Sequence, residues 1–188
     1  DDRILLEIGF PKGSMQLVDT HKSNEVLKLT SHLKSSLASG GSAANTIHGI
    51  ARLGMETAFL GKIGSDEFGE IFVNDLIKSR IKPNLFKSDT STGRAVAMVT
   101  PDSERTFATY LGAAVELSPD EITPEIFQGY DLLHIEGYLV FNESLIEKAV
   151  KTAKDAGLLV SLDLASFNVV EAKLDFLKRI TETYVDIL

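Results

Sequence analysis

The segment with the clearest chemical potential is a run of small residues that ends in an asparagine, Ser39-Gly40-Gly41-Ser42-Ala43-Ala44-Asn45. Small residues let a ligand approach the backbone closely. The helix predicted to follow offers unpaired N–H groups at its start, Ser42 a hydroxyl, and Asn45 both a donor and an acceptor. The combination suits a polyhydroxylated ligand, although a plain glycine turn before a capped helix explains the same residues. It is neither a Walker loop nor the dinucleotide Gly-x-Gly-x-x-Gly, because neither pattern occurs here.

A second segment with functional potential is a pair of strand-like runs, Gly93 to Thr100 and Arg105 to Leu111. The turn-forming residues 101–104 join them, so together they predict a β-hairpin. Residues 14–19 form a third short strand candidate. Hairpins inserted into an α/β chain often form a flap over a site, and a purely structural edge hairpin is the equal alternative.

The elements that must position these segments alternate between helix and strand beyond about residue 40, which predicts an α/β fold with a parallel sheet. Helices are expected at residues 43–53, with Ser42 as cap and Gly54 as stop, and at residues 67–80. Asn142 is expected to cap another helix that stops near Gly157, and residues 118–121 form a capping box for a short helix. Strands are expected at residues 57–63 and 159–164.

Composition excludes several classes of protein. The 188 residues carry 27 acidic and 19 basic side chains and a formal charge of −8, which argues against a surface for nucleic acid or anionic lipid. The absence of cysteine excludes disulfides, thiolate metal sites and cysteine nucleophiles. No apolar run approaches the roughly 20 residues that cross a bilayer, so we expect a soluble, cytoplasmic protein.

The remaining charged residues have simpler interpretations. The four histidines show no metal-ligand spacing and are interpreted as structural. The acidic surplus, including Glu116 and Glu121, is interpreted as a solvated face. The chain opens without an initiator methionine, and the apolar run Tyr184 to Leu188 predicts the start of a buried strand.

The spacing of the glycines resembles the first conserved motif of the PfkB/ribokinase family of carbohydrate and nucleoside kinases. That resemblance rests on Gly41, Asn45, Gly54 and Gly64 and on the phrase from Phe59 to Gly69. The segments 92–95, 104–107 and 111–114 look like the lid hairpin of that family. The segments 131–138, 163–166 and 184–188, together with Ile47, look most like its adenosine-kinase branch.

The resemblance covers nearly the whole chain and implies a ribokinase-like three-layer α/β sandwich with a small β-sheet lid, present here as a fragment. Residues 1–188 would be the N-terminal and central part of one domain, with lid strands near residues 14–19 and 93–111. The first strand and the C-terminal nucleotide-binding part would be absent. The implied activity is ATP-dependent transfer of the γ-phosphate to a primary hydroxyl of an adenosine-like nucleoside or a sugar, with Mg²⁺ required.

The same resemblance implies roles for individual residues. Gly41, Ser42 and Asn45 would hold substrate hydroxyls, and Met15 and Leu17 on a lid strand would cover the sugar or base. The planar guanidinium of an arginine matches phosphate oxygens, so the lid residue Arg105 would reach the phosphate during transfer. A solvated surface arginine is the alternative. Glu136 and Tyr138 are added as substrate residues because open α/β sheets bind ligands at the carboxyl ends of strands.

No catalytic residue is assigned. The family's catalytic aspartate lies in a Gly-Ala-Gly-Asp-like segment, which does not occur in this sequence, so we expect it in the missing C-terminal part. Asp66 and Asp163 fit structural roles instead. The fragment alone is therefore predicted to be inactive.

Two other functions compete with a kinase. One is a noncatalytic sugar- or nucleoside-binding regulatory protein on the same fold, and the other, a Rossmann oxidoreductase, is disfavoured by the missing glycine fingerprint. Members of the family occur as monomers or as lid-mediated homodimers, and the sequence leaves both open.

Overall fold

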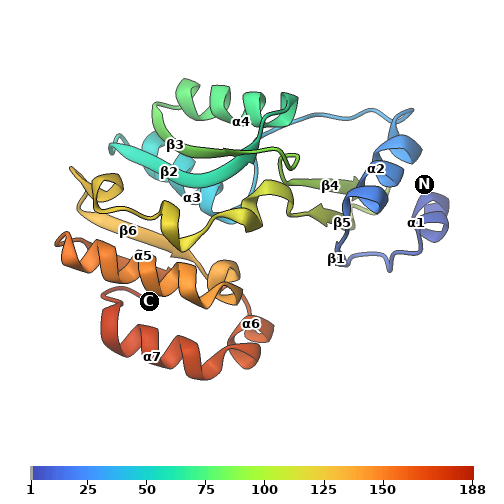
Figure 1. Cartoon of the computed structure of the whole chain (residues 1–188). Coiled ribbons are helices and arrows are strands. Elements are labelled where there is room, and N and C mark those ends of the chain that lie inside the picture. The colour runs from blue at the N-terminus through green and yellow to red at the C-terminus, as the bar shows by residue number, and fades with distance from the viewer. Residues whose placement is uncertain (1) are drawn as a thin grey trace. The chain divides into compact units, whose positions relative to one another are not determined.

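A computed structural model describes residues 2–188 (Figure 1). Asp1, with which the chain opens in place of an initiator methionine, lies outside the described residues. The chain divides into two compact units, the first formed by Asp1–Gly40 and His48–Glu116 and the second by Gly41–Ile47 and Leu117–Leu188. Helix α3 (Ser42–Arg52) contributes to both, its first residues to the second unit and its last to the first.

The first unit contains a three-stranded sheet, here called the lid sheet, in the order β1-β5-β4. The strands are β1 (Met15–Leu17), β4 (Arg94–Val99) and β5 (Arg105–Tyr110). Strands β4 and β5 are antiparallel and β1 is parallel to β5, so the predicted hairpin and third strand are confirmed. Strand β1 ends before Asp19 because the Asp19 carboxylate accepts the Lys22 N–H and caps the next helix.

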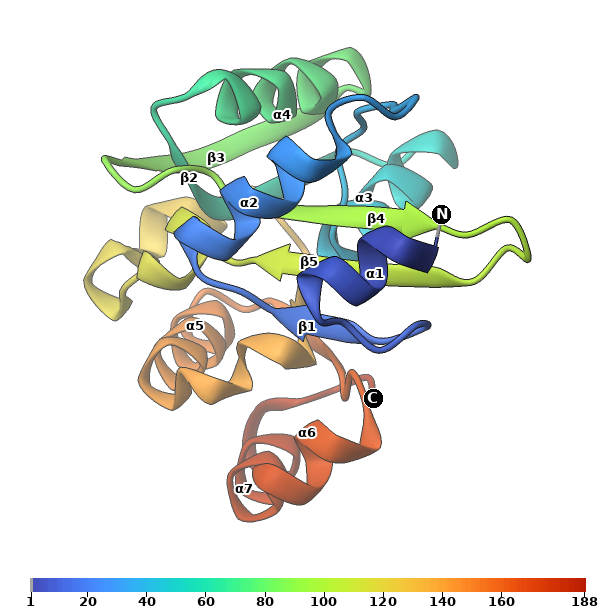
Figure 2. The same cartoon turned by 90° about the vertical axis from the view of Figure 1, so that its right-hand side faces the viewer.

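Two helices cover one face of the lid sheet, α1 (Asp2–Ile8) and α2 (Thr20–Thr30) (Figure 2). A small apolar core lies between these helices and the sheet, formed by Leu5 and Ile8 of α1, Val26 of α2 and Ala108 of β5. Among the described residues of the first unit, no helix covers the opposite face in the same way. Alternate residues of each strand point to this face, and Ala95, Ala97 and Val99 are exposed there.

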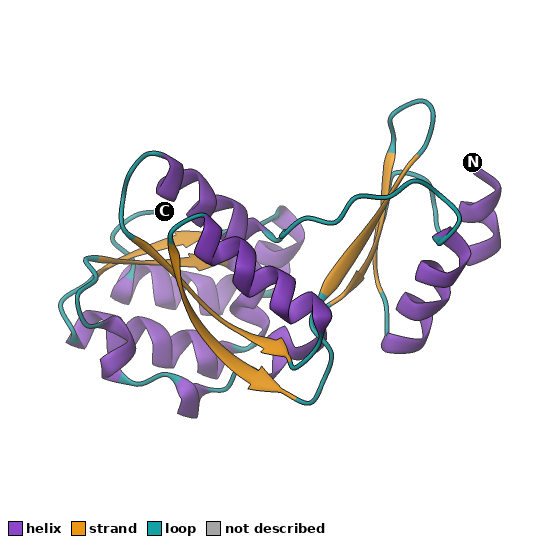
Figure 3. Cartoon of the chain, turned by 90° about the horizontal axis from the view of Figure 1, so that it is seen from above, coloured by secondary structure: helices purple, strands orange, loops and turns teal. Residues whose placement is uncertain are grey.

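The rest of the first unit is a parallel strand pair with one helix, α4 (Glu67–Lys78), lying along it, as Figure 3 shows from above. The pair consists of β2 (Thr57–Gly64) and β3 (Ile81–Ser88), followed after the lid by the short helix η1 (Gly112–Glu116). The rings of Phe59 and Phe72 meet edge to face at 5.2 Å and fix α4 on β2. Helix α4 ends two residues before its predicted end, and Arg80 then adopts a left-handed φ of 59°.

The second unit is built on another parallel pair, β6 (Leu132–Glu136) and β7 (Leu159–Asp163). Helix α5 (Glu143–Asp155) begins as predicted, because the Asn142 side chain accepts the Leu145 N–H at 3.2 Å. The buried face of this helix lies in the core of the unit with Val160 of β7 and Ile180 of α7. The other elements are η2 (Pro119–Glu121), η3 (Pro124–Phe127), η4 (Gly137–Phe141), α6 (Phe167–Ala172) and α7 (Leu174–Tyr184).

The expected parallel sheet is present among the described residues as two separate parallel pairs rather than one continuous sheet. The closing run does begin a further strand, since Ile187 forms a parallel bridge with Ser161. The prediction that this run is buried is wrong, because Ile187 is 48% and Leu188 68% exposed. The Asp186 carboxylate holds the run at the edge of β7 by accepting bonds from Lys154 and from the Val160 N–H.

Candidate functional site

The start of α3 presents the predicted small-residue segment at the surface. Gly41 has a φ of +100°, a left-handed conformation that favours glycine. Its backbone oxygen accepts the N–H of Asn45 at 2.9 Å, so Gly41 is the residue that precedes the helix. Ser42 is therefore the first helical residue, which corrects its prediction as the cap. Gly41, Ser42 and Asn45 are exposed while Ala44 is buried, so the helix start is anchored and its polar groups are open.

The end of β6 is the second candidate region, in the same unit as the start of α3. Glu136 is the last residue of β6, 6% exposed, and pairs in register with Asp163 of β7. Its carboxylate has no hydrogen bond or ion pair to any described residue. Gly137 follows, and Tyr138 is 52% exposed. The strand end thus combines a largely buried glutamate with an accessible aromatic ring.

The lid sheet brings the other three predicted residues onto one face. Met15 lies opposite Phe107, Leu17 opposite Thr109, and Arg105 opposite Val99. Paired residues share a face of a sheet, and Thr106 and Ala108 point to the other, covered face. Met15 and Leu17 are 52% and 63% exposed. Arg105 is exposed as well, and its side chain has no hydrogen bond or ion pair within the described part of the chain.

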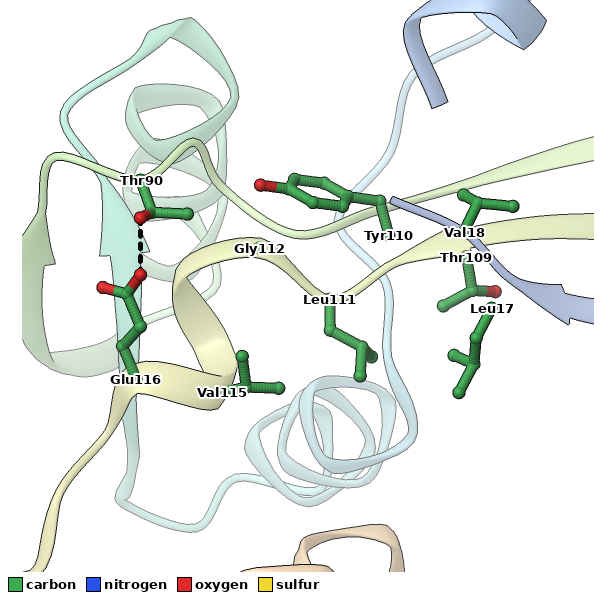
Figure 4. Close-up of a pocket in the computed structure, with 9 residues that line it drawn as sticks. All are labelled: Leu17, Val18, Thr90, Thr109, Tyr110, Leu111, Gly112, Val115 and Glu116. Carbon is green, nitrogen blue, oxygen red and sulfur yellow. Dashed lines mark hydrogen bonds between the residues drawn. The ribbon is translucent and has the colours of Figure 1, made fainter. Parts of the chain in front are cut away.

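Leu17 also lines an open pocket of about 270 Å³ at the root of the lid sheet (Figure 4). Apolar side chains of Leu111 and Val115 form one part of its lining, and the Tyr110 ring another. At its polar end the Glu116 carboxylate accepts hydrogen bonds from the hydroxyls of Ser88 and Thr90. The pocket offers apolar contact next to one anionic group.

Among the acidic residues interpreted as a solvated face, Glu116 also has specific partners. It is exposed, but the hydroxyls of Ser88 and then Thr90 lower the pKa of its carboxyl, which outweighs a small effect of burial. Its backbone oxygen also accepts the Lys62 ammonium at 3.2 Å. Glu121 is structural too, since its carboxylate accepts the Ser118 N–H at 2.9 Å in the predicted capping box.

The two aspartates interpreted as structural have structural contacts. Asp66 is the N-cap of α4 and accepts the Gly69 N–H at 2.9 Å. Asp163 accepts the N–H of Ala165, which adopts a φ of 64°. Both carboxylates thus organise the backbone where they lie.

Two of the four histidines each lie against one polar neighbour. His134 Nδ1 is 3.2 Å from Ser161 Oγ, and His48 Nε2 is 3.5 Å from Asp75 Oδ2. Over residues 2–188, no three histidine or acidic side chains gather as a metal site would require. The same residues include no helix with the length and apolar character of a membrane span.

Comparison with known protein families decides the relationship. Residues 15–188 match the model described as pfkB family carbohydrate kinase. The chain belongs to this family. The prediction drawn from the glycine motif and the lid hairpin is therefore confirmed, and with it the ribokinase-like fold.

Curated pfkB relatives include plant fructokinases. Probable fructokinase-5 of Arabidopsis thaliana is 35% identical over 133 residues, which cover 67% of this chain and 41% of the relative. Probable fructokinase-2 of the same plant is 32% identical over 165 residues, 84% of this chain and 49% of the relative. The chain spans about half the length of the curated relatives it matches.

Solved structures of the family match the fold. The adenosine kinase from Sinorhizobium meliloti has a TM-score of 0.81 and 32% identity and covers 99% of this chain, which spans 58% of that structure. A probable sugar kinase from Rhizobium etli has a TM-score of 0.82 and 30% identity, with the same coverage of both chains. The similarity thus extends to both nucleoside and sugar kinases of the pfkB family.

Sequence reasoning missed several residues at the lid root, among them Tyr110, Val115 and the binding partners of Arg94. The signal for Arg94 was present, because it directly follows the Thr92-Gly93 pair at the start of the hairpin. Its contacts with α2 could not be predicted, because α2 itself was not predicted.

Proposed function

We propose that the full-length protein is an ATP-dependent kinase that phosphorylates a primary hydroxyl of an adenosine-like nucleoside or of a sugar. The observation that carries this proposal is the match of residues 15–188 to the pfkB family. The names of the relatives, fructokinase and adenosine kinase, define the two substrate classes to be compared.

In this proposal the start of α3 binds substrate hydroxyls. Ser42 and Asn45 are exposed and supply both donors and acceptors. Gly41 keeps the approach to the backbone open, because it has no side chain and an added Cβ would meet no atom within 4 Å. The free N–H groups of the first helical turn add further donors.

Glu136 and Tyr138 complete the polar contacts of the second unit. The Glu136 carboxylate accepts no hydrogen bond from the described residues, so it is available to accept one from a hydroxyl of the substrate. The exposed Tyr138 ring, two residues further along the chain, offers a flat surface. The sheet end is the expected place for a ligand in an open α/β fold.

The lid sheet contributes apolar cover and one positive charge. Met15 and Leu17 are large apolar side chains left exposed on one face, and a sugar or base that bound there would remove them from water. Arg105 lies on the same face and has no described partner, so its guanidinium is available for a phosphate.

ATP, when bound, would supply the γ-phosphoryl group for transfer, and Mg²⁺ would neutralise charge on its phosphates. In this proposal Arg105 contacts the phosphate and would neutralise charge that develops during transfer. The catalytic aspartate and most of the nucleotide site are predicted to lie outside this sequence. The fragment alone is accordingly predicted to be inactive, and the whole protein to be cytoplasmic and either a monomer or a lid-mediated homodimer.

The test is an assay of ADP release by the full-length protein with ATP and Mg²⁺, over adenosine, other nucleosides, ribose and fructose. A clear preference for one acceptor supports the kinase and names its substrate. No ADP release over the whole panel would contradict it. Binding of a sugar or nucleoside by calorimetry without turnover would favour the noncatalytic binding protein instead.

A further inference from the structure

The root of the lid sheet is a place where chain segments pack backbone against backbone. A Cβ added to Gly64 would lie 2.6 Å from both the Thr90 oxygen and the Thr92 nitrogen. One added to Gly93 would lie 2.4 Å from the Leu111 oxygen, and one added to Gly112 would lie 2.3 Å from the Ser91 oxygen. The segments that enter and leave the hairpin therefore cross each other and the end of β2 without intervening side chains.

A polar group, here called the root clamp and formed by Gly64, Asp66 and Thr92, holds this crossing together. Asp66 accepts the Thr92 hydroxyl at 2.6 Å with one carboxylate oxygen and the Thr92 N–H at 2.8 Å with the other. The Thr92 hydroxyl oxygen in turn accepts the Gly64 N–H at 2.9 Å. Thr92 is 7% exposed, so these bonds are shielded from water.

These bonds exceed what a helix cap requires. Capping α4 takes one bond, from the Gly69 N–H to Asp66. The two bonds to Thr92 span 26 residues and contribute nothing to the helix. Burial raises the pKa of Asp66, but the hydrogen bonds from Thr92 and Gly69 and the charge of Arg94 outweigh it and lower that pKa. Asp66 is therefore ionised and its bonds are charge-assisted.

Arg94 connects the lid sheet both to α2 and to the first turn of α4. Its Nε donates to the Ser23 hydroxyl at 2.9 Å, and a second guanidinium nitrogen donates to Asn24, both on α2. The guanidinium carbon lies 5.5 Å from the centre of the Phe68 ring and 5.3 Å from that of Tyr110. Helix α2, strands β4 and β5 and helix α4 thus meet at the Arg94 side chain.

We propose that Asp66, Thr92 and Arg94 are positioning residues that set the angle of the lid sheet on β2 and α4, and through it the place of Arg105. This inference rests on the proposed kinase function. Arg105 pairs with Val99, at the end of β4 farthest from the clamp. The six residues of β4 form a lever of about 20 Å, so a rotation of about 5° at the root moves Arg105 by between 1 and 2 Å.

The lever predicts which kinetic constant changes. Leu17 lies opposite Thr109, close to the root, and moves little when the lid rotates, whereas Arg105 at the tip moves most. Displacement of about 1 Å at a reacting group can lower a rate by about 100-fold. Loosening the clamp should therefore lower kcat by about tenfold or more and change the KM for the acceptor by less than about threefold.

The test uses Thr92→Val in the full-length protein, which keeps the shape of the side chain and removes the hydroxyl. Thr92→Ser keeps the hydroxyl and should restore kcat to within about twofold of the parent. Thr152→Val is the matched control, because Thr152 is a comparably buried threonine (6% exposed) in α5 whose hydroxyl donates to the backbone oxygen of Lys148. It should leave kcat unchanged.

A readout independent of activity measures the lid angle itself. Spin labels are attached to the substitutions Val99→Cys, near the lid tip, and Ile77→Cys, on α4, in a background without other reactive cysteines. Both are exposed positions of the same unit. We expect one narrow distance distribution in the parent, in Thr92→Ser and in Thr152→Val, and a broadened or shifted one in Thr92→Val. An unchanged distribution in Thr92→Val, or equal changes in Thr152→Val, would overturn the proposal. If the parent transfers no phosphate, the kinase proposal fails while this distance measurement still decides the clamp.

Discussion

Gly137 lies so close to the end of β7 that a Cβ added to it would stand 2.2 Å from the backbone oxygen of Asp163. The same Cβ would lie 2.8 Å from the carbonyl carbon of Leu164 and 3.0 Å from the nitrogen of Ala165. These three atoms belong to the backbone, which cannot move aside as the end of a flexible side chain could. Glycine therefore allows the carboxyl ends of β6 and β7 to approach each other directly after Glu136.

The first prediction follows from this approach. Gly137→Ala should lower the free energy of unfolding by about 1 to 3 kcal/mol, because the strand ends must separate. The control is Gly49→Ala within α3, where an added Cβ meets no atom within 4 Å. This substitution should raise the free energy of unfolding by up to about 1 kcal/mol. Denaturant unfolding of the full-length protein measures both, and equal effects of the two substitutions would contradict the account.

Asn45 supplies the second prediction. Asn45→Ala should raise the KM for the acceptor about tenfold or more, because it removes the proposed contact with a substrate hydroxyl. It should cause no loss of thermal stability, because the side chain is exposed at the helix start. Asn74→Ala, an exposed asparagine of α4, is the matched control and should leave the KM unchanged. Steady-state assays with the preferred acceptor check this, and a parent-like KM in Asn45→Ala would remove that residue from the site.

The third prediction concerns Arg105. Arg105→Ala should lower kcat by about 100-fold, the cost typical of losing one group that stabilises transition-state charge. Arg105→Lys keeps the charge without the planar fork and should recover part of the rate. Arg52→Ala removes an exposed arginine at the end of α3 and serves as control. A kcat within about twofold of the parent in Arg105→Ala would favour the plain surface arginine.

Elements with strong local signals were predictable from the sequence. The helix capped by Asn142 and the hairpin joined at residues 101–104 have capping or turn residues at both ends, and both were found. Strand β3 was missed, because Pro83 and two lysines interrupt its apolar pattern, and proline is tolerated in a strand at the edge of a sheet. Helix α2 was missed because Asp19 was assigned to the preceding strand rather than to a cap.

The candidate site was predictable to the extent that it consists of motif residues. The glycine spacing led to Gly41 and Asn45, and the hairpin led to Arg105. The clamp between Asp66 and Thr92 was not predicted, because it joins residues 26 positions apart, and nothing local in either segment specifies the partner. Contacts of this kind follow from the tertiary packing of glycines against backbone, which a single sequence does not reveal.

The fourth prediction concerns pH and the tip of the lid hairpin. The Lys12 ammonium lies 2.8 Å from the Asp102 carboxylate, and the Thr100 hydroxyl donates to it at 2.6 Å. The Lys12 contact, followed by the Thr100 bond, lowers the pKa of Asp102 to about 2 from an ordinary value of 3.8. Because the folded-state pKa is the lower one, the ionised carboxylate stabilises the fold above about pH 4, and this contribution is lost as the pH falls toward 2.

Asp102→Asn should therefore lower the thermal midpoint of the full-length protein at pH 7, and the difference from the parent should shrink as the pH falls below 4. Because Asp102 is exposed, 0.5 M salt should also reduce the difference at pH 7. Asp120→Asn, at an exposed aspartate of η2, is the control and should not show this trend. Melting curves between pH 7 and pH 3 measure it. A difference that stayed constant over this range would show that the contact with Lys12 does not stabilise the hairpin, because only the ionised carboxylate pairs with the ammonium.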